Sequence, residues 1–191
     1  MQVRVLSGIP LFFYGNNMIL RPIIFLDIDG VLNTPTTPGF QTVHGKIEPA
    51  LVQNLNTIVG TFADGINIVI SSHWRIWHDR RTIAAMLYNA GLSHKAYVIG
   101  VTGNDYMPSA PQTDDYDGDP VYHVPPILKT CKSRGQEIAD WLLDHPDANA
   151  DSRWAIIDDN SWMLKSQHPR FVLTDTANGL TANKAKDVIR I

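Results

Sequence analysis

Two aspartates separated by one residue follow an apolar run and precede a glycine. The run is Ile23–Leu26, and Asp27, Asp29 and Gly30 come after it. Because alternate residues of an extended strand project to the same side, both carboxylates can face one ligand where the strand opens into a loop. Two carboxylates this close raise one another's pKa, which favours a divalent cation or a shared proton between them. The pattern is typical of a phosphoryl-transfer site, although turns and calcium loops also use it.

Polar residues follow other expected strands as well. Ser71 ends the second strand, and Asp158 and Asp159 end the fourth. Ligands of parallel α/β sheets bind beyond the carboxyl ends of the strands, so we expect these side chains to meet at one edge. The carboxylates are the hard oxygen ligands that Mg²⁺ prefers, and Lys132 or Arg134 would balance the charge of a phosphoryl group. Taken singly, each residue could instead cap a turn or helix or lie on a solvated face.

The elements that must position these residues form an alternating pattern. Apolar strands alternate with amphipathic helices, which predicts a three-layer α/β fold with a five-stranded, mostly parallel sheet and helices on both faces. The expected strands are 22–28, 66–71, 96–99, 153–158 and 171–173. The expected helices are 47–62, 79–90, 136–143 and one that begins after Thr181.

Composition narrows the class of protein. The chain has 191 residues, of which 44% are apolar, so it is long enough for one compact domain. Its net charge of −3 provides no general attraction to nucleic acid or to an anionic membrane. The single cysteine, Cys131, suits a reducing compartment, and no apolar run approaches the roughly 20 residues that span a membrane. We therefore expect a cytoplasmic protein with no membrane association and predict no protein partner.

Two segments depart from the alternating pattern. Residues 1–21 are interpreted as an N-terminal extension that packs on a domain formed by 22–191. Residues 101–131 form a long insertion rich in Pro, Asp, Tyr and Gly, which we interpret as a lid or substrate loop. The segment 31–46 is too short for a folded cap. A domain that is capless, or has a minimal cap, leaves an open site suited to the end of a macromolecule.

The motifs resemble those of the haloacid dehalogenase (HAD) superfamily of phosphohydrolases. The four matching motifs are Asp27-Ile28-Asp29-Gly30, Ser71, Lys132 or Arg134, and Asp158-Asp159. More narrowly, the chain from about residue 22 onward resembles the HAD domain of multidomain RNA repair proteins, which is related to the phosphatase domain of polynucleotide kinase-phosphatases. The residues that carry this narrower likeness are Phe25–Asn33, Ser71–Arg75, Arg134–Ile138, Trp141-Leu142, Ile157–Asp159 and Gly179–Thr181. The sequence contains no Gly-x-x-x-x-Gly-Lys-Ser/Thr loop, so we expect no kinase half in it.

The resemblance implies a Rossmann-like (HAD-like) fold and a two-step mechanism. Asp27 would attack phosphorus and form an aspartyl-phosphate, while Asp29 would protonate the leaving oxygen and then activate water. A Mg²⁺ ion would be held by Asp27, the backbone carbonyl of Asp29 and Asp158, with Asp159 close by. Ser71 would hold the phosphoryl oxygens.

The basic residue and the substrate contacts are less defined by the motifs. Arg134 is preferred to Lys132 as the phosphoryl-binding cation because it immediately precedes the expected helix and fits the Arg-Gly-x-Glu-Ile pattern. Ser72, Arg75 and Gly30 are the expected substrate-binding residues. The adjacent Trp74 is more readily interpreted as buried packing than as a base-stacking residue.

The resulting hypothesis is a Mg²⁺-dependent phosphomonoesterase that acts on phosphate ends of RNA or DNA, in a nucleic-acid repair role. The alternatives are a nucleotidase or small-molecule phosphatase, and a non-catalytic phosphate-binding module on the same fold.

Overall fold

The computed structural model describes residues 13–14, 17–18, 21–103, 132–150 and 153–191. The strands are β1 (Phe13–Tyr14), β2 (Asn17–Met18), β3 (Ile23–Leu26), β4 (Ile66–Ile70), β5 (Ala96–Val101), β6 (Trp154–Asp158) and β7 (Phe171–Leu173). The α-helices are α1 (Pro49–Gly60), α2 (Arg80–Asn89), α3 (Arg134–Asp144), α4 (Pro146–Ala150) and α5 (Ala182–Ile189). Two short 3₁₀ helices are η1 (His73–Ile76) and η3 (Lys165–Arg170).

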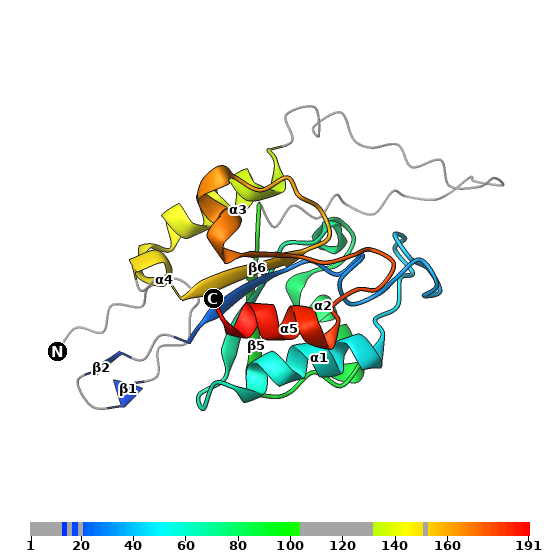
Figure 1. The fold of residues 1–191 in the computed structure, drawn as a ribbon, viewed down its shortest axis with the longest axis horizontal. Coiled ribbons are helices and arrows are strands. Elements are labelled where there is room, and N and C mark those ends of the chain that lie inside the picture. Colours follow the sequence, from blue (N-terminus) through cyan, green and yellow to red (C-terminus); the bar gives the residue numbers. More distant parts are fainter. Residues whose placement is uncertain (1–12, 15–16, 19–20, 104–131, 151–152) are drawn as a thin grey trace.

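The main sheet has five parallel strands in the order β5-β4-β3-β6-β7 (Figure 1). Strand β3 is central, and its Leu26 pairs with Ile70 of β4 on one side and with Ile157 of β6 on the other. From β3 the chain first adds β4 and β5 on one side and later adds β6 and β7 on the opposite side. The carboxyl ends of β3 and β6 therefore flank a topological switch point, where ligands of open α/β sheets bind.

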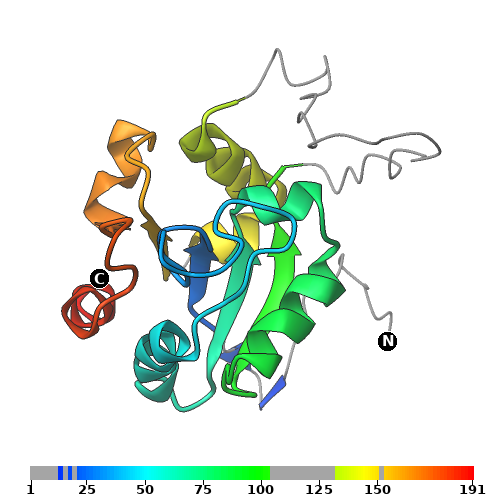
Figure 2. The same cartoon turned by 90° about the vertical axis from the view of Figure 1, so that its right-hand side faces the viewer.

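Helices cover both faces of this sheet. Helices α1, α2 and α5 pack on one face, where the larger apolar cluster includes Leu55, Leu87 and Val188. Helix α3 and the short α4 cover the opposite face (Figure 2). A second apolar cluster lies there and includes Phe25 and Trp141, whose rings meet edge to face. The α/β, three-layer Rossmann-like prediction is confirmed, and every strand pair of this main sheet is parallel.

Side-chain caps explain where three of the described helices begin. Asp79, Ser133 and Thr181 each accept a backbone N–H with their side chain and begin α2, α3 and α5. This side-chain acceptor satisfies a backbone donor that has no partner inside the helix. Helix α1 instead begins with Pro49, which lacks the N–H that would need such a cap.

The boundaries differ from the sequence expectations at several ends. The first strand is Ile23–Leu26 rather than 22–28, and the third continues to Val101 rather than ending at 99. The helix expected over 136–143 begins earlier, at Arg134. The pattern analysis did not predict η1, α4, η3 or the β1–β2 hairpin, because these segments are too short to show a hydrophobic period.

Two expected segments have different outcomes. Residues 31–46 form successive turns without a helix or strand of their own, so this segment holds no folded cap, as expected. Most of the insertion expected at 101–131 lies outside the described residues, as does most of the N-terminal extension.

None of the described helices is both long enough and apolar enough to cross a membrane.

Candidate active site

Asp27 and Asp158 lie side by side at the switch point. Asp27 directly follows β3 and its N–H donates to the Ile157 carbonyl at 3.0 Å, while Asp158 is the last residue of β6. Both side chains are buried, at 5% and 0% exposure for the two residues. The parallel register of β3 and β6 therefore places two carboxylates at neighbouring strand ends, as the sequence predicted.

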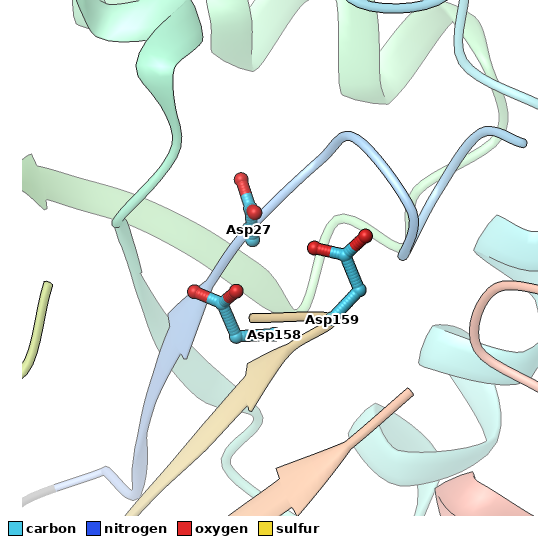
Figure 3. A group of neighbouring side chains, drawn as sticks. All are labelled: Asp27, Asp158 and Asp159. Atoms are coloured by element: carbon cyan, nitrogen blue, oxygen red, sulfur yellow. The ribbon is translucent and has the colours of Figure 1, made fainter. Parts of the chain in front are cut away.

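Asp159 joins these two carboxylates. One carboxylate oxygen from each of Asp27, Asp158 and Asp159 lies within 4.8 Å of the others. Figure 3 shows the three side chains gathered where β3 and β6 end. Burial, and then repulsion from Asp27, raises the pKa of Asp158 to about 8, and burial also raises the pKa of Asp159. Full ionisation of the three carboxylates is therefore unfavourable unless a cation is present to balance their charge.

Arg134 is the cation that contacts this cluster. Its Nη1 lies 3.3 Å from Asp27 Oδ1 and 3.1 Å from Asp158 Oδ2. The Ser133 cap makes Arg134 the first residue of α3, which directs a buried guanidinium across the ends of β3 and β6. Lys132 is elsewhere: its side chain is 61% exposed and pairs with Asp140 at 2.5 Å. Of the two predicted basic residues, the structure brings Arg134 to the carboxylates and places Lys132 on the surface.

Asp29 is held by two side-chain donors. Asn33 Nδ2 donates to Asp29 Oδ1 at 2.8 Å, and Trp74 Nε1 donates to Asp29 Oδ2 at 3.1 Å. The Asp29 carboxylate does not belong to the three-carboxylate group formed by its neighbours. Of the four expected metal ligands, only Asp29 therefore lies outside the group, and its expected metal contact through the backbone carbonyl stays a prediction.

Gly30 makes the sharp turn after Asp29 possible. Its φ is +71°, a conformation that side chains disfavour, and a Cβ here would overlap the Asp159 carboxylate. The Gly30 N–H donates to Asn33 Oδ1, and its carbonyl accepts from Thr174 Oγ1 at 2.9 Å. This glycine thus allows the first loop to approach the carboxylates after β6.

The two serines after β4 have different surroundings. Ser71 is fully buried, and its Oγ has no hydrogen-bond partner in the described part of the chain. A buried hydroxyl without a partner is costly, so an oxygen-rich ligand would stabilise it. Ser72 Oγ instead accepts the Trp74 N–H at 3.3 Å and caps η1. Ser71 Oγ is thus the serine hydroxyl without a partner here, whereas Ser72 Oγ already caps a helix.

An ion pair joins helix η1 to the first turn of α3. Both carboxylate oxygens of Glu137 accept from Arg75 Nη2 at 2.7 Å, and Arg75 Nη1 donates to the Ser72 carbonyl at 2.7 Å. Arg75, which we expected to bind substrate, is thus engaged within the protein. Trp74 is only 1% exposed, in agreement with the packing interpretation.

His73 contacts the Arg134 side chain directly. Arg134 Nη2 donates to His73 Nδ1 at 3.3 Å, which leaves the ring proton on Nε2. Burial, and then the positive charges of Arg134 and Arg75, lowers the pKa of His73, so the ring is neutral at pH 7. A neutral imidazole can accept this hydrogen bond, whereas a protonated one would repel the guanidinium.

Several contacts at the site were missed by the sequence analysis. Thr176 Oγ1 donates to Asp159 Oδ2 at 2.6 Å, and Thr174 and Asn33 support Gly30 as described above. The threonines follow β7, so the rule that polar residues gather at strand ends would have found them. The Trp74 contact with Asp29 has no comparable sequence signal, because the two residues are 45 positions apart.

A cavity of about 250 Å³ lies at the opposite edge of the sheet. Its lining includes Ile23, Ile66 and Trp154 at the amino-terminal ends of their strands, together with Phe62 and Arg153. Its lining includes no Asp or Glu, and it lies at the end of β3 opposite to Asp27. The candidate active site is therefore the carboxylate group at the carboxyl edge of the sheet.

Comparison with known proteins agrees with this geometry. A family model described as the HAD domain in Swiss Army Knife RNA repair proteins matches residues 23–185. This range includes the four aspartates of the candidate site and Arg134. No curated protein and no solved structure matched the chain. The match covers most of the chain and confirms the resemblance that the motifs indicated. The chain belongs to the family of HAD domains found in Swiss Army Knife RNA repair proteins.

Proposed function

We propose that this domain is a Mg²⁺-dependent phosphomonoesterase that acts on phosphorylated nucleic-acid ends through an aspartyl-phosphate. Family membership supports a phosphatase-type activity in RNA repair. The observation that carries the proposal is the buried Asp27 carboxylate beside Asp158 and Asp159, with Arg134 bridging two of the three.

The residues present fit a magnesium ion. Asp27, Asp158 and Asp159 offer hard oxygen donors within a small space, and burial, then repulsion from Asp27, raises the pKa of Asp158. These three residues would hold the ion, and the Asp29 carbonyl would complete the protein contribution. When bound, Mg²⁺ would neutralise charge so that a carboxylate and a phosphate dianion can approach one another.

Asp27 would be the nucleophile that attacks phosphorus. Its Oδ1 accepts the Ile28 N–H at 2.8 Å and contacts Arg134, whereas Oδ2 accepts no hydrogen bond from any described residue. In the first step an Asp27 oxygen forms a bond to phosphorus, and the bond from phosphorus to the leaving oxygen breaks. Water then attacks phosphorus, and cleavage of the bond to Asp27 releases inorganic phosphate and restores the carboxylate.

Asp29 would move the protons in both steps. It would give a proton to the leaving oxygen and later take one from the attacking water. Asn33 and Trp74 fix its carboxylate through both oxygens. Ser71 Oγ and the Arg134 guanidinium would hold the phosphoryl oxygens. This role would give a partner to the unpartnered Ser71 hydroxyl and would employ the positive charge of the buried Arg134 side chain.

The substrate is proposed to be a nucleic-acid end rather than a small metabolite. The turns at 31–46 form no folded cap over the carboxylates, and the family model concerns RNA repair. A nucleotidase or small-molecule phosphatase is the alternative within the same chemistry. A non-catalytic phosphate-binding module is the alternative outside it.

Phosphate release by wild type and Asp27→Asn tests the proposal. The substrates are matched 3′- and 5′-phosphorylated oligonucleotides, mononucleotides and an aryl phosphate, each with Mg²⁺ or EDTA. We expect Mg²⁺-dependent turnover that favours one oligonucleotide end and is lost in Asp27→Asn. Turnover confined to mononucleotides or the aryl phosphate would favour the small-substrate alternative. Undiminished turnover in Asp27→Asn would rule out the aspartyl-phosphate.

A further inference from the structure

Trp162 displays a large aromatic surface next to the candidate active site. It is 70% exposed, and its indole makes no hydrogen bond or ring contact with other described residues. Single exposed apolar side chains are common and need no explanation by themselves. Trp162 differs from such residues in its position, because it lies three residues after Asp159 and its backbone is tied to the site.

Three hydrogen bonds fix the backbone around Trp162. Its N–H donates to Asn160 Oδ1 at 3.0 Å, and the Asn160 N–H donates to Asp158 Oδ1 at 2.8 Å. On the other side, the Gly135 N–H donates to the Trp162 carbonyl at 3.1 Å. Trp162 is therefore connected both to a carboxylate of the cluster and to the residue that follows Arg134.

The following residues pack tightly against the first turn of α3. A Cβ added at Gly135 would lie 2.5 Å from the Leu164 nitrogen and 2.9 Å from Met163 Cα. The Met163 side chain is buried in the cluster beneath α3, so the loop directs Met163 inward and Trp162 outward. A ring presented by an anchored backbone loses little conformational freedom when a flat ligand binds to it.

The distance and charge suit a nucleotide whose phosphate reaches Asp27. Three residues of chain span at most about 11 Å, which limits the separation of the Asp159 and Trp162 Cα atoms. Lys165, three residues further on, is exposed and has no ion-pair partner in the described part of the chain. Aromatic faces and basic side chains together are the combination that binds the bases and backbone of single-stranded nucleic acid, and here the two are three residues apart in the chain.

We propose that Trp162 stacks on the base of the terminal nucleotide whose phosphate is removed at Asp27. This inference rests on the proposed function and deepens it, because stacking would favour a single-stranded nucleic-acid end over a phosphate that carries no base. Every base has a π-face, so the contact would add affinity without reading sequence.

Steady-state kinetics of Trp162→Ala test the proposal. The substrates are an oligonucleotide with the preferred terminal phosphate, the same oligonucleotide with an abasic terminal nucleotide, and 4-nitrophenyl phosphate. We expect the ratio of kcat/KM on the oligonucleotide to that on the aryl phosphate to fall about tenfold, mainly through KM. On the abasic substrate, wild type and Trp162→Ala should have nearly the same kcat/KM.

Two further variants separate stacking from other effects. Trp162→Tyr retains an aromatic face and should restore most of the ratio. Leu143→Ala removes a side chain that is 73% exposed on α3 and should leave both activities unchanged. Two results would overturn the stacking proposal. The first is that Trp162→Ala leaves the ratio of oligonucleotide to aryl-phosphate kcat/KM unchanged, and the second is that the substitution lowers this ratio equally for the abasic oligonucleotide. The former result would direct attention to a protein partner for this indole.

A binding assay distinguishes failure of the stacking proposal from failure of the proposed function. Fluorescence anisotropy of a labelled, phosphorylated oligonucleotide is measured with Asp27→Asn and with the double variant Asp27→Asn/Trp162→Ala in Mg²⁺. About tenfold weaker binding by the double variant would support stacking even if wild type hydrolyses no substrate. Equal binding, or no binding by Asp27→Asn, would contradict stacking whatever the catalytic result.

Discussion

The indole Nε1 of Trp74 donates a hydrogen bond to Asp29 Oδ2 at 3.1 Å, although the two residues are 45 positions apart in the chain. Asn33 Nδ2 holds the other oxygen at 2.8 Å. The ring of Trp74 is buried, and its Cζ2 would lie 2.5 Å from a Cβ added at Gly45. The close packing around this ring determines where its N–H points, and thereby fixes one side of the Asp29 carboxylate.

Trp74→Phe should impair proton transfer to the leaving group. Phenylalanine keeps most of the ring volume but removes the donor, and a hydrogen bond to a charged group contributes about 1.5–3 kcal/mol. We expect kcat/KM to fall about tenfold or more on alkyl phosphates and oligonucleotides. Aryl phosphates need less protonation of the leaving oxygen, so their loss should be smaller. Equal losses on both classes would contradict a positioning role for Trp74.

Arg134→Ala should destabilise the metal-free protein. Its guanidinium compensates two buried carboxylates, and removal of one partner from a buried ion pair costs about 3–5 kcal/mol. Urea unfolding in EDTA measures the loss. Lys132→Ala is the matched control, because Lys132 lies on the surface against Asp140, and it should leave stability and activity near wild type. Similar losses in the two variants would contradict the assignment of Arg134 to the carboxylate cluster.

The pH dependence of stability should report Asp158. Its pKa is raised from 3.8 in the ordinary case to about 8, by burial and then by Asp27. Between these values the folded protein holds a proton that the unfolded chain has released. The stability associated with Asp158 is therefore present below the unfolded pKa and is lost as the pH rises towards about 8.

Thermal melts in EDTA across this pH range measure that loss, with Asp158→Asn as the comparison. His73 has a lowered pKa and therefore acts in the opposite direction, but it is present in both proteins. The difference in Tm between wild type and Asp158→Asn should shrink as the pH is lowered. Saturating Mg²⁺ should oppose the loss in wild type, because the metal binds the ionised carboxylate and releases its proton. A pH-independent difference would contradict the raised pKa.

The repeating parts of the fold were readily predicted from the sequence. The apolar runs at Ile23–Leu26 and Ile66–Ile70 are buried along their whole length, as expected for central parallel strands. Thr181 caps the last helix as predicted, because its hydroxyl satisfies a local backbone donor. Helix η1 was missed, since it depends on the Ser72 cap and on the long-range contact between Arg75 and Glu137.

The carboxylate cluster could be predicted because strand order brings successive carboxyl ends together. Asp27, Asp158 and Asp159 meet for this reason. The motifs favoured Arg134 over Lys132, and the structure brings Arg134 to the carboxylates, because the Ser133 cap makes Arg134 the first residue of α3 whereas Lys132 lies before the cap. Trp74 did require the structure, because burial of a ring does not reveal where its N–H points.

Gly30→Ala should weaken the candidate metal site more than it weakens the fold. At φ +71° an alanine costs about 1–2 kcal/mol, and its Cβ would overlap the Asp159 carboxylate. Asp159 is also held by Thr176, so it cannot move without loss of that hydrogen bond. We expect weaker Mg²⁺ binding by calorimetry and a loss of stability in urea.

Gly60→Ala is the matched control for that substitution. Gly60 ends α1, a Cβ there would meet nothing within 4 Å, and its backbone does not have a positive φ. Alanine at this position should increase stability by about 0.4–1 kcal/mol, because it restricts the unfolded chain. Magnesium affinity should stay at the wild-type value. If Gly30→Ala bound Mg²⁺ as tightly as Gly60→Ala, displacement of Asp159 would have no effect on the ion, and Asp159 would not be a ligand.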